Sequence, residues 1–292
     1  MAEQERVGFI GLGAMGARMA GNVLAAGYPL TVYNRDKEKT RDIAGRGAGV
    51  ADSPRDVAAR SDTVILMLSD PAAVRAVVMG EQGVFTGARE GLTLIDMSTV
   101  GPSDALAMVE AAQGRGVRVI NAPVLGTLGP AAKGELLVLA GGDERLVERE
   151  RPLLETMGKA VQYLGRNESA SAAKLAANLL LAGSMQLFGE AVAVMTRWGL
   201  PREQAVEMLG ETTVVSPALK GKRAAMFDPD AAVDFGLRLA RKDLWLIVAA
   251  AYERGASAPL AAAALETYSM AVNTHGDEDS ARIAAYIDDV SG

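Results

Sequence analysis

Two groups of residues in this chain have types and spacings that could do chemistry. The first is Gly11-Leu-Gly13-Ala-Met-Gly16, a G-x-G-x-x-G pattern that directly follows the apolar run 6–10. The second is Lys174 and Asn178, which stand in the stretch 169–189, where Lys174 is the only charged residue. The glycine pattern is typical of backbone that receives a dinucleotide pyrophosphate. The lysine is a candidate group for donating or accepting a proton.

The glycine pattern predicts a strand, a tight turn and a helix in that order. The first glycine permits the turn, the second lets backbone approach phosphate, and the third lets the helix pack on the strand. We expect a helix over 14–26, ended by Gly27, whose N-terminal N–H groups face the phosphates. An ordinary glycine turn is the alternative, but a second apolar run at 30–33 completes the order that a dinucleotide site requires. The predicted cofactor contacts here are Gly11, Leu12, Gly13, Ala14, Met15 and Gly16.

The end of the second strand carries information on the coenzyme. Asn34 and Arg35 stand where an NAD site usually has an acidic residue for the ribose 2′-hydroxyl. A guanidinium pairs with a 2′-phosphate through two hydrogen bonds, so we predict NADP rather than NAD, with Asn34 and Arg35 as contacts. The alternative is that Arg35 is only a solvated loop residue and that Asp36 turns back to the ribose.

The stretch around Lys174 is long enough to cross a membrane, but Lys174, Asn178 and Gln186 interrupt its apolar character. We therefore expect a helix that runs through the protein, with Ser171, Lys174 and Asn178 on one face. Burial disfavours the charged form of a lysine, and none of the residues three or four positions away is acidic. A lysine that extends its amine into solvent is the alternative. We favour an acid or base at Lys174 that takes part in catalysis.

Composition excludes several classes of function. The chain has 292 residues, 49% of them apolar, and a net charge of −6 with scattered basic residues, which argues against a nucleic-acid partner. It has no cysteine and one histidine, His275, so we expect no thiolate chemistry, no disulfide and no metal site. No signal-like segment precedes the first strand, so we expect a cytoplasmic protein without a membrane partner.

The first half of the chain alternates short apolar runs with amphipathic helices, which predicts an α/β fold with a doubly wound parallel sheet. The second half, from about 169, has helical periodicity almost without strands. We place the domain boundary near Gly165, between 1–165 and 166–292. The further predicted strands are 63–68, 92–96, 118–120, 136–140 and 160–163, and the predicted helices are 53–59, 71–79, 170–198, 202–209, 218–226, 231–253, 259–273 and 279–290.

Over nearly its whole length the chain resembles the β-hydroxyacid dehydrogenase family, which includes 3-hydroxyisobutyrate dehydrogenases, tartronate semialdehyde reductases and glyoxylate/succinic semialdehyde reductases. Several motifs at appropriate separations are more specific than any one of them. The segments that carry the resemblance are 8–16 with Met19-Ala20, Asp96-Met-Ser-Thr99 with Pro102, Asn121-Ala-Pro-Val124 with Gly126, Gly134, Gly141-Gly142, Lys174-Leu-Ala-Ala-Asn178 and Lys242-Asp243-Leu244.

The resemblance implies an N-terminal Rossmann-type domain and a C-terminal all-helical domain, joined by a long helix. The helical domain would bind substrate and build a homodimer or a higher homo-oligomer. Lys174 would be the catalytic lysine, and Asn178 would help to hold the substrate. The further cofactor contacts that it implies are Leu68, Ser69, Thr99 and Lys242. Asp243 we interpret as a solvated ion-pair partner of Lys242.

The chain departs from the family's usual Asp-Ala-Pro-Val-Ser-Gly-Gly, a loop that receives the substrate carboxylate in those enzymes. Here the segment 121–127 reads Asn-Ala-Pro-Val-Leu-Gly-Thr, so an apolar side chain replaces a polar one at Leu125. The glycines that usually precede the lysine are also replaced, by Glu168 and Ala170. The expected substrate contacts are Val124, Leu125, Gly126 and Thr127.

Together these observations predict an NADP-dependent oxidoreductase that transfers a hydride between NADPH and a small carbonyl or hydroxy acid. Semialdehydes, glyoxylate and 3-hydroxyacids are the expected substrates, with Lys174 as general acid and base. One alternative is an imine reductase-like NADPH enzyme for more apolar substrates, which Leu125 would suit, although such enzymes generally lack this lysine. Another is a nucleotide-binding module without catalysis.

Overall fold

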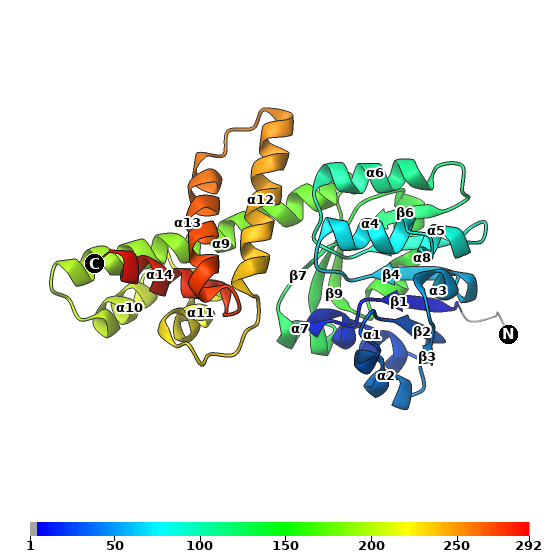
Figure 1. Cartoon of the computed structure of the whole chain (residues 1–292), viewed down its shortest axis with the longest axis horizontal. Coiled ribbons are helices and arrows are strands. Elements are labelled where there is room, and N and C mark those ends of the chain that lie inside the picture. Colours follow the sequence, from blue (N-terminus) through cyan, green and yellow to red (C-terminus); the bar gives the residue numbers. More distant parts are fainter. Residues whose placement is uncertain (1–4, 292) are drawn as a thin grey trace. The chain divides into compact units, whose positions relative to one another are not determined.

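The computed structural model describes residues 5–291 and divides into two compact units, Met1–Lys174 and Leu175–Gly292 (Figure 1). The first unit contains a parallel sheet with helices, and the second contains helices. The predicted α/β class, with a Rossmann-type first part and a helical second part, is confirmed. Both units contain part of the long helix α9 (Asn167–Arg197), since Lys174 is the last residue of the first unit.

Six parallel strands form the main sheet of the first unit in the order β3-β2-β1-β4-β5-β6. Every residue of β1, β4 and β5 is buried, because continuous Val, Ile and Leu runs suit a sheet that is covered on both faces. The strands are β1 (Val7–Ile10), β2 (Leu30–Tyr33), β3 (Gly49–Val50), β4 (Thr63–Leu66), β5 (Thr93–Asp96) and β6 (Arg118–Asn121).

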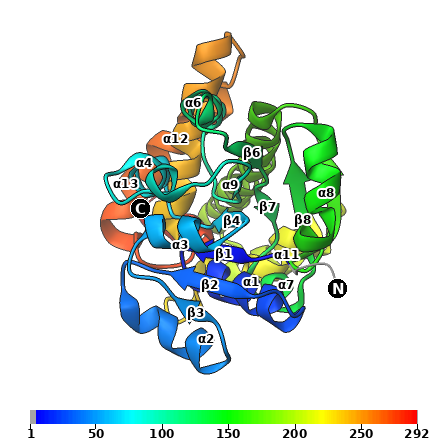
Figure 2. The ribbon, with the colours of Figure 1, turned by 90° about the vertical axis from the view of Figure 1, so that its right-hand side faces the viewer.

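Helices lie on both faces of this sheet and build two separate cores (Figures 1 and 2). Phe9 of β1 packs into one core with α1 (Ala14–Ala25) and α8 (Glu144–Leu154). Its neighbour Ile10 packs into the other core with α3 (Pro54–Arg60), α4 (Pro71–Met79) and α6 (Pro102–Ala112). This alternation along the strand makes the sheet doubly wound. The unit also contains the 3₁₀ turn η1 (Lys37–Thr40) and the helices α2 (Arg41–Gly45), α5 (Val84–Gly87) and α7 (Leu128–Lys133).

The two predicted strands at 136–140 and 160–163 are present but do not extend the main sheet. They are β8 (Leu136–Ala140) and β9 (Gly158–Tyr163), which form a three-stranded sheet with β7 (Val124–Leu125) in the order β7-β8-β9. β7 pairs antiparallel with β8, and β8 pairs parallel with β9, so these two predicted strands belong to a second, mixed sheet. An apolar run predicts a buried strand but not which neighbour it pairs with, since that depends on the loop that precedes it.

The second unit packs its helices around one core that includes Met185, Phe188 and Val192 of α9 and the fully buried Tyr268. By length and composition α9 could cross a membrane, with a mean hydropathy of 1.5 over its most apolar window. Its contacts with this core make it a core helix of the unit. The further elements are α10 (Arg202–Glu211), α11 (Pro217–Phe227), α12 (Leu237–Arg254), α13 (Pro259–His275), η2 (Ser280–Arg282) and α14 (Ile283–Val290).

The predicted helix over 231–253 is wrong at its beginning, because α12 starts only at Leu237. The buried carboxylate of Asp279 accepts hydrogen bonds from the backbone N–H groups of Asp234 and Phe235, at 3.0 and 3.2 Å. The ammonium of Lys222 also binds this carboxylate, at 2.7 Å. The segment before α12 therefore satisfies its N–H groups with a side chain from a later part of the sequence, and it does not need a helix.

Candidate active site

The glycine turn after β1 has the form that a pyrophosphate requires. Gly11 has a φ of +101°, and a Cβ at this position would lie 2.3 Å from the carbonyl oxygen of Met67. A Cβ at Gly16 would lie 1.9 Å from the carbonyl oxygen of Gly11, so α1 can approach the turn only with glycine there. Gly13 is exposed and has no atom within 4 Å of its Cβ position. The turn is therefore closed on the protein side and open at Gly13, which fits a bound dinucleotide.

The N-terminus of α1 contributes to the same site. Gly13 is the N-cap of this helix and supplies no side-chain hydrogen bond to the first N–H groups. These groups are the ones that a phosphate satisfies in dinucleotide-binding folds, where the helix dipole also favours negative charge. Ala14 is exposed and Met15 half-buried, as expected for residues that follow the turn toward a ligand.

The side chain of Asn34 supports the glycine turn. Its Oδ1 accepts a hydrogen bond from the backbone N–H of Leu12 at 2.9 Å, and its Nδ2 donates to the carbonyl oxygen of Asp36 at 2.8 Å. The carboxylate of Asp36 accepts from the N–H of Glu38 at 3.1 Å and so caps η1. Both side chains are therefore engaged with the protein itself.

Arg35 differs from its two neighbours. Its side chain is exposed, and within residues 5–291 the guanidinium makes no hydrogen bond or ion pair. It follows β2, whose carboxyl end lies beside that of β1 in the parallel sheet. Of the two charged side chains that follow this strand, the Asp36 carboxylate already accepts a backbone hydrogen bond, whereas the Arg35 guanidinium makes none with residues 5–291.

The hydroxyl of Ser98, which follows β5, joins the carboxyl ends of β4 and β5, and Asp96 fixes the backbone of Ser98. The N–H of Leu68 donates to Oγ of Ser98 at 3.0 Å, and the N–H of Ser98 donates to Oδ1 of Asp96 at 2.9 Å. Asp96 and Ser98 are fully buried, whereas the predicted contacts Ser69 and Thr99 are exposed and half-buried. Leu68, Ser69 and Thr99 thus lie at the sheet edge that also carries the glycine turn. Ser98 belongs to the quoted motif, but its role in fixing Leu68 was not predicted.

The segment after β6 contains the predicted substrate contacts. The side chain of Val124 is buried in the core, so only its backbone could reach a ligand. Leu125 is half-buried, and Gly126 has a φ of +138°, a conformation that glycine adopts most easily. Thr127 is exposed and is the N-cap of α7, with no side-chain hydrogen bond to the helix. Leu125 and Thr127 are therefore the side chains of this segment that can contact a substrate.

Lys174 lies half-buried on α9 in the first unit. One turn before it, Ser171 is buried and donates a hydrogen bond from Oγ to Oδ1 of Asn121 at 2.6 Å. Asn121 is the last residue of β6, at the carboxyl edge of the main sheet. The helix turn that leads to Lys174 is thus attached to the edge where the predicted cofactor contacts of this unit lie.

The second unit brings Asn178 and Lys242 together through a residue whose role was not predicted. The carboxylate of Asp243 accepts a hydrogen bond from Nδ2 of Asn178 at 2.5 Å and pairs with Nζ of Lys242 at 2.9 Å. Asp243 is only 3% exposed, so its interpretation as a solvated partner of Lys242 is wrong. A buried carboxylate requires such partners, and here they fix the orientation of the Asn178 amide.

The opposite, amino edge of the sheet carries a cluster of charged and polar residues. Oγ1 of Thr63 lies 2.6 Å from Oε1 of Glu5 and 3.3 Å from Oε2 of Glu150. Burial raises the pKa of Glu5 above its usual value. The hydrogen bond from the guanidinium of Arg6 lowers the pKa of Asp62. Glu5, Arg6, Asp62 and Thr63 precede or begin β1 and β4, and Glu150 of α8 lies against Thr63. Ligands of a parallel sheet bind at the carboxyl ends of its strands, so these residues lie away from the candidate site.

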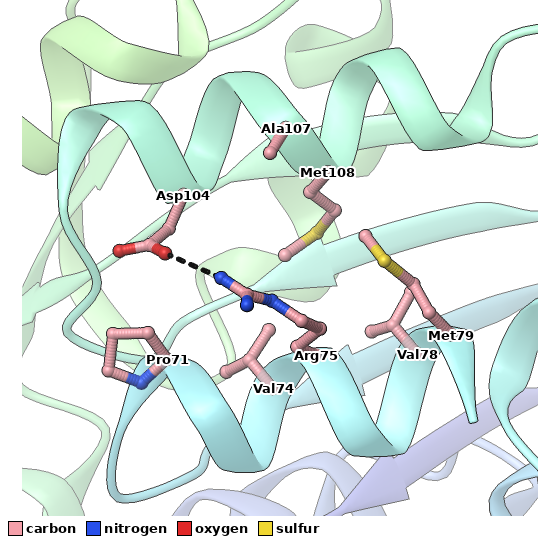
Figure 3. A pocket seen from close by; sticks show the side chains of 8 residues that line it. All are labelled: Pro71, Val74, Arg75, Val78, Met79, Asp104, Ala107 and Met108. Atoms are coloured by element: carbon pink, nitrogen blue, oxygen red, sulfur yellow. Dashed lines mark ion pairs between the residues drawn. The ribbon is translucent and has the colours of Figure 1, made fainter.

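Two hollows in the surface, one in each unit, are lined by none of the predicted site residues. Figure 3 shows one in the first unit, about 20 Å³ in volume, where Arg75 of α4 faces Asp104 of α6 at 3.6 Å. This volume suffices for roughly one water molecule. A second hollow, about 360 Å³ in volume, lies between α10 and α11 of the second unit.

The chain is similar to known dehydrogenases over both units. A family model described as the NAD binding domain of 6-phosphogluconate dehydrogenase matches residues 6–165. A second, described as NAD-binding of NADP-dependent 3-hydroxyisobutyrate dehydrogenase, matches residues 169–287. Glyoxylate/succinic semialdehyde reductase 1 of Arabidopsis thaliana is 36% identical over 91% of this chain and 92% of its own length. 2-(Hydroxymethyl)glutarate dehydrogenase of Eubacterium barkeri is 31% identical over 92% of this chain and 89% of its own length.

A solved structure shows the same similarity. The 3-hydroxyisobutyrate dehydrogenase of Mycobacterium tuberculosis, determined with L-serine, has a TM-score of 0.85 and is 28% identical. The similarity covers 97% of this chain and 99% of that one. It thus includes both units and extends beyond the glycine turn to the helices that carry Lys174, Asn178 and Lys242.

Proposed function

Because the chain belongs to the β-hydroxyacid dehydrogenase family and is an NAD(P)-dependent oxidoreductase, we propose that it reduces a small carbonyl compound with NADPH, with Lys174 as the proton donor. The observation that carries the proposal is the anchoring of α9 on either side of this lysine. Ser171 binds Asn121 in the first unit, and Asn178 binds Asp243 in the second. Such anchoring gives a catalytic side chain a defined orientation.

The names of the relatives support an aldehyde or a hydroxyl group beside a carboxylate as the reacting unit. The Arabidopsis relative is named for glyoxylate and succinic semialdehyde, and the Eubacterium relative for a hydroxymethyl diacid. For this chain we infer a substrate of the semialdehyde, glyoxylate or 3-hydroxyacid type.

The chemistry divides between the cofactor and the chain's own residues. Reduced nicotinamide, when bound, supplies the hydride. Lys174 donates a proton to the carbonyl oxygen of the substrate as negative charge develops there, and in the oxidative direction its neutral amine accepts the hydroxyl proton. Asn178 binds the substrate with an amide that Asp243 keeps in one orientation. The resemblance to the family supports Thr99 in the first unit and Lys242 in the second as residues that would contact the nicotinamide.

Three neighbouring side chains support NADP over NAD. Asn34 is occupied with the glycine turn, and Oδ1 of the Asp36 carboxylate caps η1, so both side chains are already engaged within the protein. The guanidinium of Arg35 is exposed and, within residues 5–291, makes no hydrogen bond or ion pair. A doubly charged 2′-phosphate is the group that this arrangement suits.

Leu125 favours one second candidate function. It is half-buried and apolar at a position where the family usually has serine. An apolar side chain in the substrate loop suits a less polar substrate, such as a cyclic imine. An imine reductase-like activity is therefore the alternative, and Lys174 argues against it because related imine reductases generally lack this lysine.

We also propose that two copies associate through α9. Leu180, Leu187 and Val194 are 73%, 55% and 62% exposed, and they follow one another at seven-residue intervals on this helix. The small residues Ala177, Ser184 and Ala191 alternate with them in a heptad pattern. A second copy of the same helix would bury this apolar seam, with large side chains packing against small ones.

The proposed function is tested with Lys174→Ala and a panel of glyoxylate, semialdehydes and cyclic imines, with oxidation of NADPH as the signal. We expect the variant to lower kcat at least ~10²-fold, with the Kd for NADPH unchanged within about twofold. Lys159→Ala, which removes an exposed lysine on β9, is the matched control. Near-normal turnover of Lys174→Ala would remove the assignment. Reduction of imines alone would establish the second candidate, and no NADPH oxidation with any compound would indicate a module without catalysis.

A further inference from the structure

The end of β6 fixes the first two turns of α9 through one buried residue. The N–H of Asn121 donates to Oδ1 of Asn167, the first residue of α9, at 2.7 Å. Oδ1 of Asn121 accepts from Oγ of Ser171 at 2.6 Å, and its Nδ2 donates to the carbonyl oxygen of Asp96 at 3.4 Å. Asn121 and Ser171 are each only 1% exposed. Backbone and side chain of a single residue therefore bind two successive turns of the helix.

The chemistry of the amide matches its surroundings. The Asp96 oxygen is a backbone carbonyl, which only accepts, so the amide must place its NH₂ group there and its oxygen toward Ser171. A carboxylate at position 121, as is usual in the family, would bring a charge into a buried place and face this carbonyl with a second acceptor. Asn121 and Ser171 thus form a complementary pair.

Close packing adds to these hydrogen bonds. Ala170 is fully buried, and a Cβ at Gly141 would lie 3.1 Å from the Cβ of Ala170 and 2.4 Å from the carbonyl oxygen of Arg166. The beginning of α9 therefore lies directly on the backbone that follows β8. Glu168 pairs with Arg166 at 2.9 Å in the same turn. Alanine and glutamate replace the usual glycines here, and the turn has little freedom to move.

Lys174 lies three residues after Ser171, one turn further along the same helix. Any rotation or slide of the first turns of α9 would move the Lys174 amine, because a helix transmits such a displacement to the next turn. We propose that Asn121 and Ser171 are positioning residues, which act on the reaction by fixing the place of the Lys174 amine. The inference rests on the proposed function, in which this amine is the proton donor.

The test compares Ser171→Ala with Ser61→Ala. Ser61 is also 1% exposed and also donates its hydroxyl to a single acceptor in the first unit, the carbonyl oxygen of Val57, but at the amino edge of the sheet. Ser171→Thr keeps the hydroxyl, and Asn121→Asp keeps the acceptor while it removes the donor to Asp96. For each variant one measures Tm, the Kd for NADPH, KM, and kcat as a function of pH.

A readout that needs no substrate is the rate at which an amine-reactive reagent labels Lys174, measured by mass spectrometry relative to the exposed Lys159. A changed position of the amine changes this ratio, whereas a simple loss of stability under native conditions leaves it as it was. The ratio thus tests the position of Lys174 even if none of the offered substrates is turned over.

We expect Ser171→Ala to lower kcat about tenfold and to shift its pH profile, with the Kd for NADPH within about twofold of wild type. The labelling ratio should change at least about threefold, since the amine moves relative to the sheet edge. Ser171→Thr should restore both values, and Ser61→Ala should lower Tm without changing either. Equal kcat in Ser171→Ala and Ser61→Ala would overturn the inference.

The proposed function and this inference fail in different ways. If wild type reduces no compound of the panel, the proposed function fails and the labelling ratio alone decides on the positioning role. An unchanged ratio in both Ser171→Ala and Asn121→Asp would then overturn it. If wild type is active and Lys174→Ala is inactive, but Ser171→Ala and Asn121→Asp retain full kcat, only the positioning role is wrong.

Discussion

Replacing Arg35 with serine should weaken NADPH selectively, because its exposed guanidinium is the group at the end of β2 that remains available to a 2′-phosphate. A bidentate contact with phosphate consists of two charge-assisted hydrogen bonds, which solvent screens at an exposed site. We take their joint contribution as about 2 kcal/mol, which corresponds to roughly a 30-fold higher KM for NADPH. NADH lacks the phosphate, so its KM should remain within about twofold of the wild-type value.

The assay is the steady-state rate at saturating carbonyl substrate with either coenzyme, at low and at high salt. In the wild type, the difference in KM between NADPH and NADH should become smaller at high salt, because screening weakens an exposed ionic contact. Arg41→Ser is the matched control, because this substitution also removes one positive charge from an exposed position. The guanidinium of Arg41, however, already pairs with the carboxylate of Glu38 at 2.5 Å. Equal losses with both coenzymes in Arg35→Ser, or a wild type that prefers NADH, would refute the assignment of Arg35.

Three further predictions concern other parts of the chain. Asp243→Asn should lower kcat and should reduce the free energy of unfolding by about 2 kcal/mol. The reason is that it removes a buried charge that binds both Asn178 and Lys242. An unchanged Tm and an unchanged kcat would contradict this prediction. Burial raises the pKa of Glu5, so ionisation of Glu5 costs the folded state stability as the pH rises from 4.5 through the raised pKa. Glu5→Gln should therefore have a higher Tm than wild type at pH 8 and the same Tm at pH 4, and a gain at pH 4 alone would reverse the sign. Leu187→Glu should yield single chains in light scattering after gel filtration, whereas Met208→Glu, which alters an exposed apolar residue of α10, should leave the mass unchanged.

The parts of the site that follow from local pattern were predicted from the sequence. The strand, the glycine turn and α1 follow from neighbouring residues, and a Cβ at Gly16 would meet the carbonyl oxygen of Gly11 within the motif itself. The contact of Gly11 with the carbonyl oxygen of Met67, by contrast, depends on the pairing of β1 with β4. The same holds for the helical spacing of Lys174 and Asn178 on α9. Periodicity therefore predicted both the fold class and the location of these residues.

The remaining features depend on contacts between distant parts of the sequence. Asp243 stands next to Lys242, and its burial against Asn178, 65 positions away, cannot be read from that neighbourhood. The late start of α12 depends on Asp279, whose carboxylate binds backbone N–H groups 45 and 44 positions earlier. Tertiary contacts of this kind override local propensity, and the pattern of residues in a single sequence does not reveal them.

The amide of Asn34 also constrains how the coenzyme preference of this protein can be altered. The customary exchange for NAD would place an aspartate at this position, but a carboxylate has no N–H to give to the Asp36 carbonyl, which Nδ2 of Asn34 now binds at 2.8 Å. The exchange would remove this hydrogen bond, which orients the side chain that binds the backbone N–H of Leu12, in return for a new contact with the ribose. A change of coenzyme preference, by design or by evolution, should therefore begin with a substitution at position 35 and keep Asn34, whose side chain holds the backbone of the glycine turn.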